Sequence, residues 1–170
     1  MLRATRVLFS ASLLNKSLPA SAVLHHTKPA DTVKPAELFG SAKKAILIGV
    51  PGAFTPGCSK THVPSYLEHY DKLKAKGVDL IGCVSVNDAF VMDAWGKDLD
   101  VQDKIMMLAD PQGKMVKELG LDFDASAALG GHRSKRFALV LENGKITKEY
   151  VEPNNTGLSV TLAENVLKEL

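Results

Sequence analysis

One cysteine stands where the pattern of the chain favours chemistry. Residues 45–50 form a short apolar run that predicts a buried strand ending at Pro51. After Cys58, apolar residues recur at intervals of three and four positions as far as Gly77, which predicts a helix. Cys58 is therefore expected in the first turn of that helix, where free backbone N–H groups and the positive end of the helix dipole favour a thiolate.

The loop before Cys58 also favours a reactive sulfur. Residues 51–58 contain two prolines and two glycines, which make the loop rigid and let backbone approach the thiol. Thr55 stands three residues upstream and can direct its hydroxyl to the same point. The alternative is that Cys58 is a small buried hydrophobic residue, the commoner role of a single cysteine. The composition of the loop favours the reactive site.

The chain resembles the peroxiredoxins, and in particular their type II, peroxiredoxin-5-like branch. Pro51, Thr55 and Cys58 match the pattern P-x-x-x-[T/S]-x-x-C of that family. Further similarity extends over about residues 36–170 and lies in residues 49–62, 84–90, 94–95, 108–111, 136–137 and 151–153. The resemblance implies an α/β, thioredoxin-like fold with a mixed central sheet and helices on both faces. It also implies a thiol-dependent peroxidase that reduces hydrogen peroxide and alkyl hydroperoxides through a Cys58 thiolate and sulfenic acid, with no cofactor.

The resemblance assigns roles to the residues around Cys58. The arginine directly before the phenylalanine of a late strand is Arg136 here, and its planar, always-charged guanidinium suits both a thiolate and a peroxide. Without the family pattern, Arg136 would be interpreted as a surface residue of a strand. Thr55, Arg136 and backbone N–H groups at Gly57 and Cys58 are expected to stabilise the breaking O–O bond. Pro51 is expected to shield the site, unless it merely ends the strand.

A second cysteine bears on how the sulfenic acid is reduced. In animal members of the family a resolving cysteine lies in the segment that matches residues 157–162, where this chain has Val160. Plant type II members carry a second cysteine at the position of Cys83, within an apolar strand, where a buried inert thiol is an equal alternative. A Cys58–Cys83 disulfide needs the two Cα atoms within about 7 Å. We expect an external reductant, glutathione with glutaredoxin or else thioredoxin, and keep Cys83 as the candidate resolving residue.

Two other classes of function remain open on the same residues. A peroxide-sensing redox-relay or partner-binding protein would use oxidation of Cys58 as a switch. An acyl-transfer enzyme would need a histidine base and a carboxylate; His62 lies one helical turn after Cys58, but no orienting pair is evident. Most of the five histidines are interpreted as solvated side chains.

Bulk composition limits the partners. The 170 residues fit one domain, and a net charge of +2 indicates no nucleic-acid partner. No apolar stretch reaches the length of a membrane span. The two cysteines belong to no C-x-x-C motif or cysteine–histidine cluster, so no metal site is expected. We expect a homodimer.

The first 30 residues differ in composition from the rest. They contain arginine, lysine and serine but no acidic residue before Asp31, which is typical of a mitochondrial transit peptide. We therefore divide the chain into a disordered or cleaved segment, residues 1–30, and a thioredoxin-like peroxiredoxin domain, residues 31–170. A secretory signal and a plain disordered tail are the alternatives. A working thiol favours the reducing mitochondrion, with the cytosol as a second location.

The rest of the chain predicts alternating strands and helices. Strands are expected at residues 78–86, 105–108, 136–141 and 145–151, and helices at residues 89–98, 114–119 and 159–170. Residues 122–132 have no clean period and predict a loop. Asn143-Gly144 between two apolar runs predicts a hairpin. Family members usually have a longer segment, including a β-hairpin, ahead of the residues that match 34–39. Here the transit-like segment leads almost directly into the domain, so the first edge of the sheet is expected to be absent or altered.

Overall fold

A seven-stranded sheet lies at the centre of the computed structural model, which describes residues 11–170, and its strand order is β2-β1-β5-β4-β3-β8-β9. The strands are β1 (Leu24–His25), β2 (Thr32–Val33), β3 (Lys44–Gly49), β4 (Leu80–Ser85), β5 (Met106–Ala109), β6 (Asp122–Asp124), β7 (His132–Ser134), β8 (Phe137–Glu142) and β9 (Lys145–Val151). The helices are α1 (Pro35–Gly40), η1 (Cys58–His62), α2 (Val63–Glu68), α3 (Tyr70–Ala75), α4 (Ala89–Asp98), α5 (Lys114–Glu118), α6 (Ser126–Leu129) and α7 (Ala163–Leu167).

The central strands run in parallel and the later ones return antiparallel. Strands β3, β4 and β5 are parallel neighbours, whereas β8 pairs antiparallel with β3 and β9 antiparallel with β8. Asn143 and Gly144 join β8 to β9 with positive φ angles of 49° and 78°, as a tight hairpin turn requires. The predicted strands and this hairpin are confirmed, and the sheet is mixed as expected.

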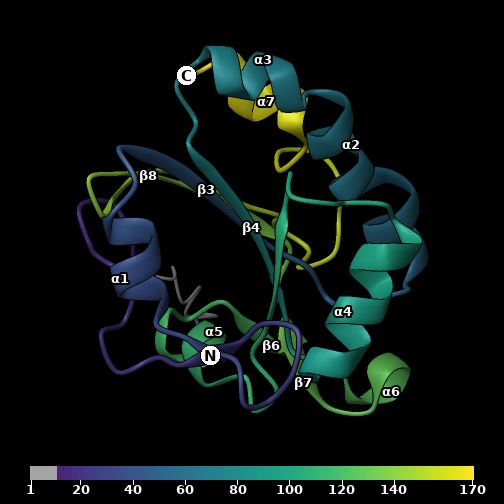
Figure 1. The fold of residues 1–170 in the computed structure, drawn as a ribbon. Helices are drawn as coiled ribbons and strands as arrows, with labels where there is room; N and C mark the ends of the chain where they lie inside the picture. The colour runs from purple at the N-terminus through teal and green to yellow at the C-terminus, as the bar shows by residue number, and fades with distance from the viewer. Residues whose placement is uncertain (1–10) are drawn as a thin grey trace, which may run out of the picture.

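Both faces of the sheet are buried. Along β3, Ile46 and Ile48 pack into one apolar cluster, while Ala45 and Leu47 pack into the other. Because both faces are covered, the strand is an unbroken apolar run rather than an alternating one. Helices α2, α3, α4 and α7 cover the first face, and α1 and α5 lie on the second (Figure 1). The predicted mixed sheet with helices on both faces is therefore present.

The N-terminal segment differs from the expectation. The prediction for residues 1–10 lies outside the described residues. From residue 11 onward the chain packs on the domain, because Leu13, Leu18 and Leu24 are buried in the second apolar cluster. Strands β1 and β2 pair with each other, and β1 pairs with β5, so the first sheet edge is present. The expected separation at residue 30 is corrected for residues 11–30, which join the domain through these apolar contacts; targeting by this region stays a prediction.

Two other expectations need correction. Residues 122–132 are not an irregular loop: they contribute β6, α6 and the first residue of β7, and β6 and β7 pair as a small second sheet. Three-residue strands are too short to show a period in the sequence. The C-terminal helix is shorter than predicted, because α7 begins only at Ala163. Within residues 11–170, every helix is too short or too polar for a transmembrane span.

The long helix expected after Cys58 is divided into η1, α2 and α3. Its first turn is a wide π-type turn in which the Val63 N–H donates to the Cys58 carbonyl, five residues back. Pro64 follows at once, and its ring has no N–H for a regular helical bond. The non-helical backbone angles of His69, φ −96° and ψ 9°, then separate α2 from α3. The prediction that Cys58 lies in the first turn of the helix is nonetheless confirmed.

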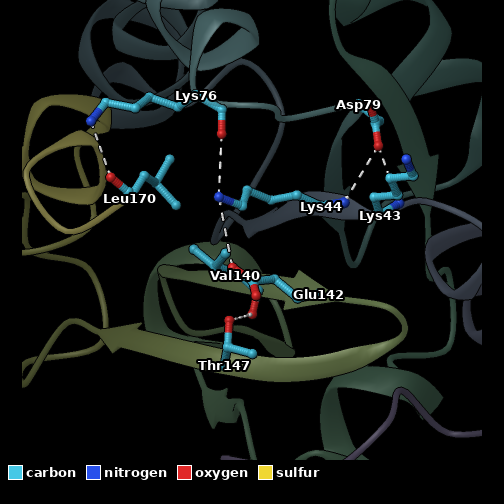
Figure 2. A network of polar contacts seen from close by, with 8 residues as sticks. All are labelled: Lys43, Lys44, Lys76, Asp79, Val140, Glu142, Thr147 and Leu170. Atoms are coloured by element: carbon cyan, nitrogen blue, oxygen red, sulfur yellow. Dashed lines mark hydrogen bonds and ion pairs between the residues drawn. The ribbon is translucent and has the colours of Figure 1, made fainter.

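A polar network fastens the end of the sheet where β3 begins (Figure 2). The Lys44 ammonium donates to the Lys76 carbonyl at 3.2 Å and lies 3.7 Å from the Glu142 carboxylate. Lys76 in turn donates to the carbonyl of the C-terminal Leu170 at 3.1 Å. These contacts join α3, β3, β8 and the chain end. They lie at the opposite end of β3 from Cys58, which leaves the other end for the site.

Candidate active site

Cys58 is held at the carboxyl end of β3 by the loop of residues 51–57. Its side chain is fully buried, and it is the first residue of η1. The Ala53 N–H donates to the Asn87 side-chain oxygen at 3.0 Å, which ties the loop to the chain after β4. The Trp95 indole donates to the hydroxyl of Ser59, the next residue after the cysteine, at 3.0 Å. The sulfur is therefore placed by contacts from two neighbouring elements.

Arg136 lies directly against the sulfur. Its side chain is 3% exposed, and its Nη1 donates to Cys58 Sγ at 3.3 Å. Its Nε donates to the Thr156 carbonyl at 3.2 Å, which fixes the plane of the guanidinium. A Cβ at Gly57 would lie 3.0 Å from Nη2, so a larger residue there would crowd the guanidinium. The expectation that Arg136 approaches Cys58 agrees with this geometry, and the surface interpretation does not.

His62 lies in the site, although the sequence pointed to it only as the base of the acyl-transfer alternative. It is fully buried, its Nδ1 lies 3.3 Å from Arg136 Nη1, and its Nε2 lies 3.2 Å from the Thr161 carbonyl. Burial, and then the charge of Arg136, lower the pKa of His62 to about 3. A neutral ring that faces a carbonyl must carry its proton on Nε2, so Nδ1 accepts from Arg136. A histidine in this state is no base for acyl transfer, which removes the support for that alternative.

Thr55 is oriented differently from the simple expectation. Its hydroxyl donates to the Gly52 carbonyl at 2.7 Å rather than to the sulfur. With that proton engaged, the oxygen presents lone pairs and acts as an acceptor. Pro51 is buried where β3 leads into this loop, while Thr55 and Gly57 are half-buried. Of these three residues, Thr55 and Gly57 are the ones that solvent partly reaches.

Cys83 lies within β4 and belongs to the core. Both cysteines are free thiols and fully buried, and Cys83 pairs in register with Ile48 and Met107 on the adjacent strands. Burial, and then the neighbouring Cys58, raise the pKa of the Cys83 thiol. Cys83 is therefore a neutral thiol near pH 7. The inert interpretation fits it better than an active resolving role.

Glu152 is a residue that the sequence did not reveal as part of the site. It is 1% exposed, and its carboxylate accepts hydrogen bonds from the backbone N–H groups of residues 159–161 and from the hydroxyls of Ser159 and Thr161, at 2.6 to 3.0 Å. Burial alone would raise the pKa of Glu152, but these hydrogen bonds outweigh it and lower the pKa to about 2.

Within residues 11–170, no group of three histidine, cysteine or acidic side chains is arranged to hold a metal ion.

The comparisons with known proteins agree with this geometry. The profile of the Redoxin family matches residues 14–167. Among curated proteins, "Peroxiredoxin-2D" of Arabidopsis thaliana is 48% identical over 132 residues, which are 78% of this chain and 81% of that protein. "Peroxiredoxin-2F, mitochondrial", from the same plant, is 47% identical over 128 residues, 75% of this chain and 64% of the relative.

Solved structures show the same fold. Reduced Prx3 from Vibrio vulnificus, in complex with hydrogen peroxide, superposes with a TM-score of 0.83 at 45% identity, covering 92% of this chain and 97% of that one. Peroxiredoxin 5 from Alvinella pompejana superposes with a TM-score of 0.76 at 39% identity, covering 84% and 91%. The thioredoxin-like fold predicted from the sequence is confirmed. This chain belongs to the redoxin family and, within it, to the peroxiredoxins.

Proposed function

We propose that this chain is a thiol-dependent peroxidase in which Cys58 attacks the peroxide. The observation that carries the proposal is the 3.3 Å contact between Arg136 Nη1 and Cys58 Sγ in a buried site. A guanidinium fixed at this distance faces both a thiolate and any oxygen that gains negative charge beside it. Membership of the peroxiredoxins and the structural likeness to a peroxide-bound relative support the same reaction.

The reaction takes place in one displacement. The thiolate sulfur attacks one oxygen of the hydroperoxide, the O–O bond breaks, and the sulfur is oxidised to a sulfenic acid. The second oxygen leaves with the electron pair of the broken bond and takes a proton, giving water or an alcohol. Arg136 donates to the oxygens as their negative charge grows. Thr55, whose own proton is held by the Gly52 carbonyl, accepts the peroxide O–H and orients the substrate.

Reduction of the sulfenic acid is assigned to an external thiol. One thiol condenses with the sulfenic acid, releasing water and forming a mixed disulfide, and a second thiol reduces that disulfide and regenerates Cys58. Burial of Cys83 in the sheet and the valine at position 160 argue against an internal partner. We assign the role to glutathione with glutaredoxin, or to thioredoxin.

We also propose a mitochondrial location and a homodimer. The acid-free composition of residues 1–30 supports targeting to mitochondria, and one relative carries that compartment in its name. The burial of Leu13 and Leu18 supports a cleavage site upstream of residue 13. The homodimer is what the resemblance to peroxiredoxins implies, and the exposed side chains of Phe54 and Phe90 are apolar surface that such a contact would cover.

A turnover assay tests the proposal. The purified protein should consume hydrogen peroxide and an alkyl hydroperoxide with glutathione and glutaredoxin, or with thioredoxin, as reductant. Cys58→Ser should abolish turnover, because a serine hydroxyl is barely ionised near neutral pH. The matched Cys83→Ser variant should keep the first oxidation step. Parental turnover in Cys58→Ser would show that another group attacks the peroxide.

A further inference from the structure

A buried carboxylate without a cation stands behind the site. Glu152 is 1% exposed, and no ion pair to it is formed by the residues of the described part. Five N–H and O–H donors compensate its charge instead, and all of them belong to residues 159–161. A buried carboxylate bonded in this way fixes the segment that supplies the donors. Residues 159–161 are therefore fixed relative to Glu152.

The segment of residues 152–161 contacts two residues of the site. At its far end, the Thr161 carbonyl accepts from His62 Nε2 at 3.2 Å and from the Tyr66 hydroxyl at 2.8 Å. At its near end, the Thr156 carbonyl accepts from Arg136 Nε at 3.2 Å. The backbone N–H of Arg136 also donates to the carbonyl of Asn155 at 2.7 Å. One short segment therefore orients both side chains behind the sulfur.

The contact between the two side chains makes their orientation matter. Arg136 Nη1 lies 3.3 Å from Cys58 Sγ and also 3.3 Å from His62 Nδ1. His62 offers Nδ1 as an acceptor only while its Nε2 proton is held by the Thr161 carbonyl. If the Thr161 carbonyl moves, it no longer accepts the Nε2 proton, and the Nε2–H tautomer of His62 is no longer favoured. Arg136 Nη1 then loses Nδ1 of His62 as a hydrogen-bond acceptor. A misplacement of about 1 Å at a reacting group can slow a reaction by roughly a hundredfold.

We infer that Glu152 is a positioning residue for the peroxidase site: by fixing residues 159–161 it holds His62, and through His62 and the same segment it aims Arg136 at Cys58. The inference rests on the proposed function, which it deepens. The hydrogen bonds of the Glu152 carboxylate all go to residues 159–161, so Glu152 acts through the two side chains that its segment holds.

An electrostatic role and a positioning role of Glu152 predict opposite effects of removing its charge. The negative charge of Glu152 raises the pKa of His62. If its charge alone mattered, Glu152→Gln would lower the pKa of His62 and would not slow peroxide attack. If position matters, the same variant slows peroxide attack even where Cys58 is fully ionised, and lets water reach His62 and raise its pKa. Glutamine keeps the shape but turns one acceptor toward Ser159 into a donor.

The experiment compares Glu152→Gln with Glu149→Gln. Glu149 lies on β9, three residues before Glu152, and accepts from Ser12 and from the backbone N–H of Leu13, so its variant loses the same charge away from the site. Stopped-flow oxidation of Cys58 by hydrogen peroxide is measured above the thiolate titration of each protein. We expect Glu152→Gln to react about tenfold more slowly, and Glu149→Gln to react at the parental rate. A Glu152→Gln rate equal to or above the parental rate overturns the inference.

Two further measurements complete the test. If Glu152→Gln does not fold, Ser159→Ala removes only one hydroxyl donor and should still slow oxidation about threefold, since one charge-assisted hydrogen bond is lost; a parental rate there overturns the inference as well. Nitrogen-15 NMR of the His62 ring needs no peroxide. We expect a single Nε2–H tautomer in the parental protein and a mixed one in Glu152→Gln. An unchanged tautomer contradicts the positioning role, whereas failure of parental Cys58 to form a sulfenic acid contradicts the proposed function.

Discussion

Lowering the pH from 7 to 5 should destabilise the folded protein by about 2 kcal/mol through His62 alone. In the unfolded chain this histidine binds a proton as the pH falls through 6.5, whereas burial and the charge of Arg136 hold its native pKa at about 3. Between these two values the unfolded state binds more protons, so stability falls as the pH falls. The contribution is fully present above pH 6.5 and is lost progressively toward pH 3. Each pH unit inside the window changes the free energy of unfolding by about 1.4 kcal/mol.

Denaturant titrations at pH 7, 6 and 5 measure this slope. His62→Gln keeps a buried hydrogen-bonding side chain but has no group that titrates in the window. Its stability should be lower than that of the parent at pH 7, because its fit to Arg136 and Thr161 is poorer, yet it should lose about 2 kcal/mol less than the parent between pH 7 and 5. His132, whose side chain is 67% exposed, supplies the control. His132→Gln should keep the parental slope.

An acid slope of His62→Gln equal to that of the parent would contradict this prediction. That result would mean that the native histidine takes up its proton near pH 6.5, and therefore that the ring is not the neutral acceptor of the Arg136 hydrogen bond. The titrations stop at pH 5 because protonation of carboxylates also lowers the free energy of unfolding at lower pH. Glu152, with a native pKa of about 2, withdraws its stabilisation as the pH falls below about 4.5, its value in the unfolded chain.

Three other outcomes follow from the same structure. Thr55→Val removes an acceptor for the peroxide O–H and should slow Cys58 oxidation about tenfold or more in stopped-flow assays; an unchanged rate would leave orientation of the substrate to Arg136. Protein treated with peroxide in the absence of thiol should accumulate oxidised Cys58, and mass mapping that finds a stoichiometric Cys58–Cys83 disulfide would instead make Cys83 a resolving residue. Residues 1–30 should direct a reporter to mitochondria, and deletion of residues 1–30 should lower thermal stability, since each buried leucine lost contributes about 2 kcal/mol. Secretion of the reporter would contradict the targeting, and equal melting temperatures would contradict the packing.

Local patterns in the sequence were enough to locate the strand, the loop and the thiol. The apolar run of β3, the prolines of the loop and the period of the helix are signals within about 30 residues of Cys58, and the structure follows them. The role expected of Arg136 came from the family resemblance, because a strand-end arginine carries no local sign of burial. Its neighbour across the site lies 78 residues earlier in the chain.

The rest depended on contacts between distant segments. His62 meets a carbonyl 99 residues away, and a histidine on a helix shows nothing in sequence that separates this position from a solvated one. Glu152 binds residues that form no regular element, so no period marks them. The first 30 residues were assigned by charge, which describes targeting, while packing was decided by a few leucines such as Leu13 and Leu24. Composition in this segment indicates targeting, whereas the burial of particular side chains decides whether the segment packs on the domain.

The rate of Cys58 oxidation in Arg136→Lys, measured beside the thiolate titration of the same protein, tests the central claim most directly. Lysine keeps the positive charge but loses the planar fork that places one nitrogen on the sulfur and another on the Thr156 carbonyl. After correction for the fraction of thiolate, the variant should react with hydrogen peroxide about 30-fold more slowly or worse, because an oriented donor to the breaking O–O bond is lost. A corrected rate equal to that of the parent would show that Arg136 supplies charge alone and would contradict its assigned role in catalysis.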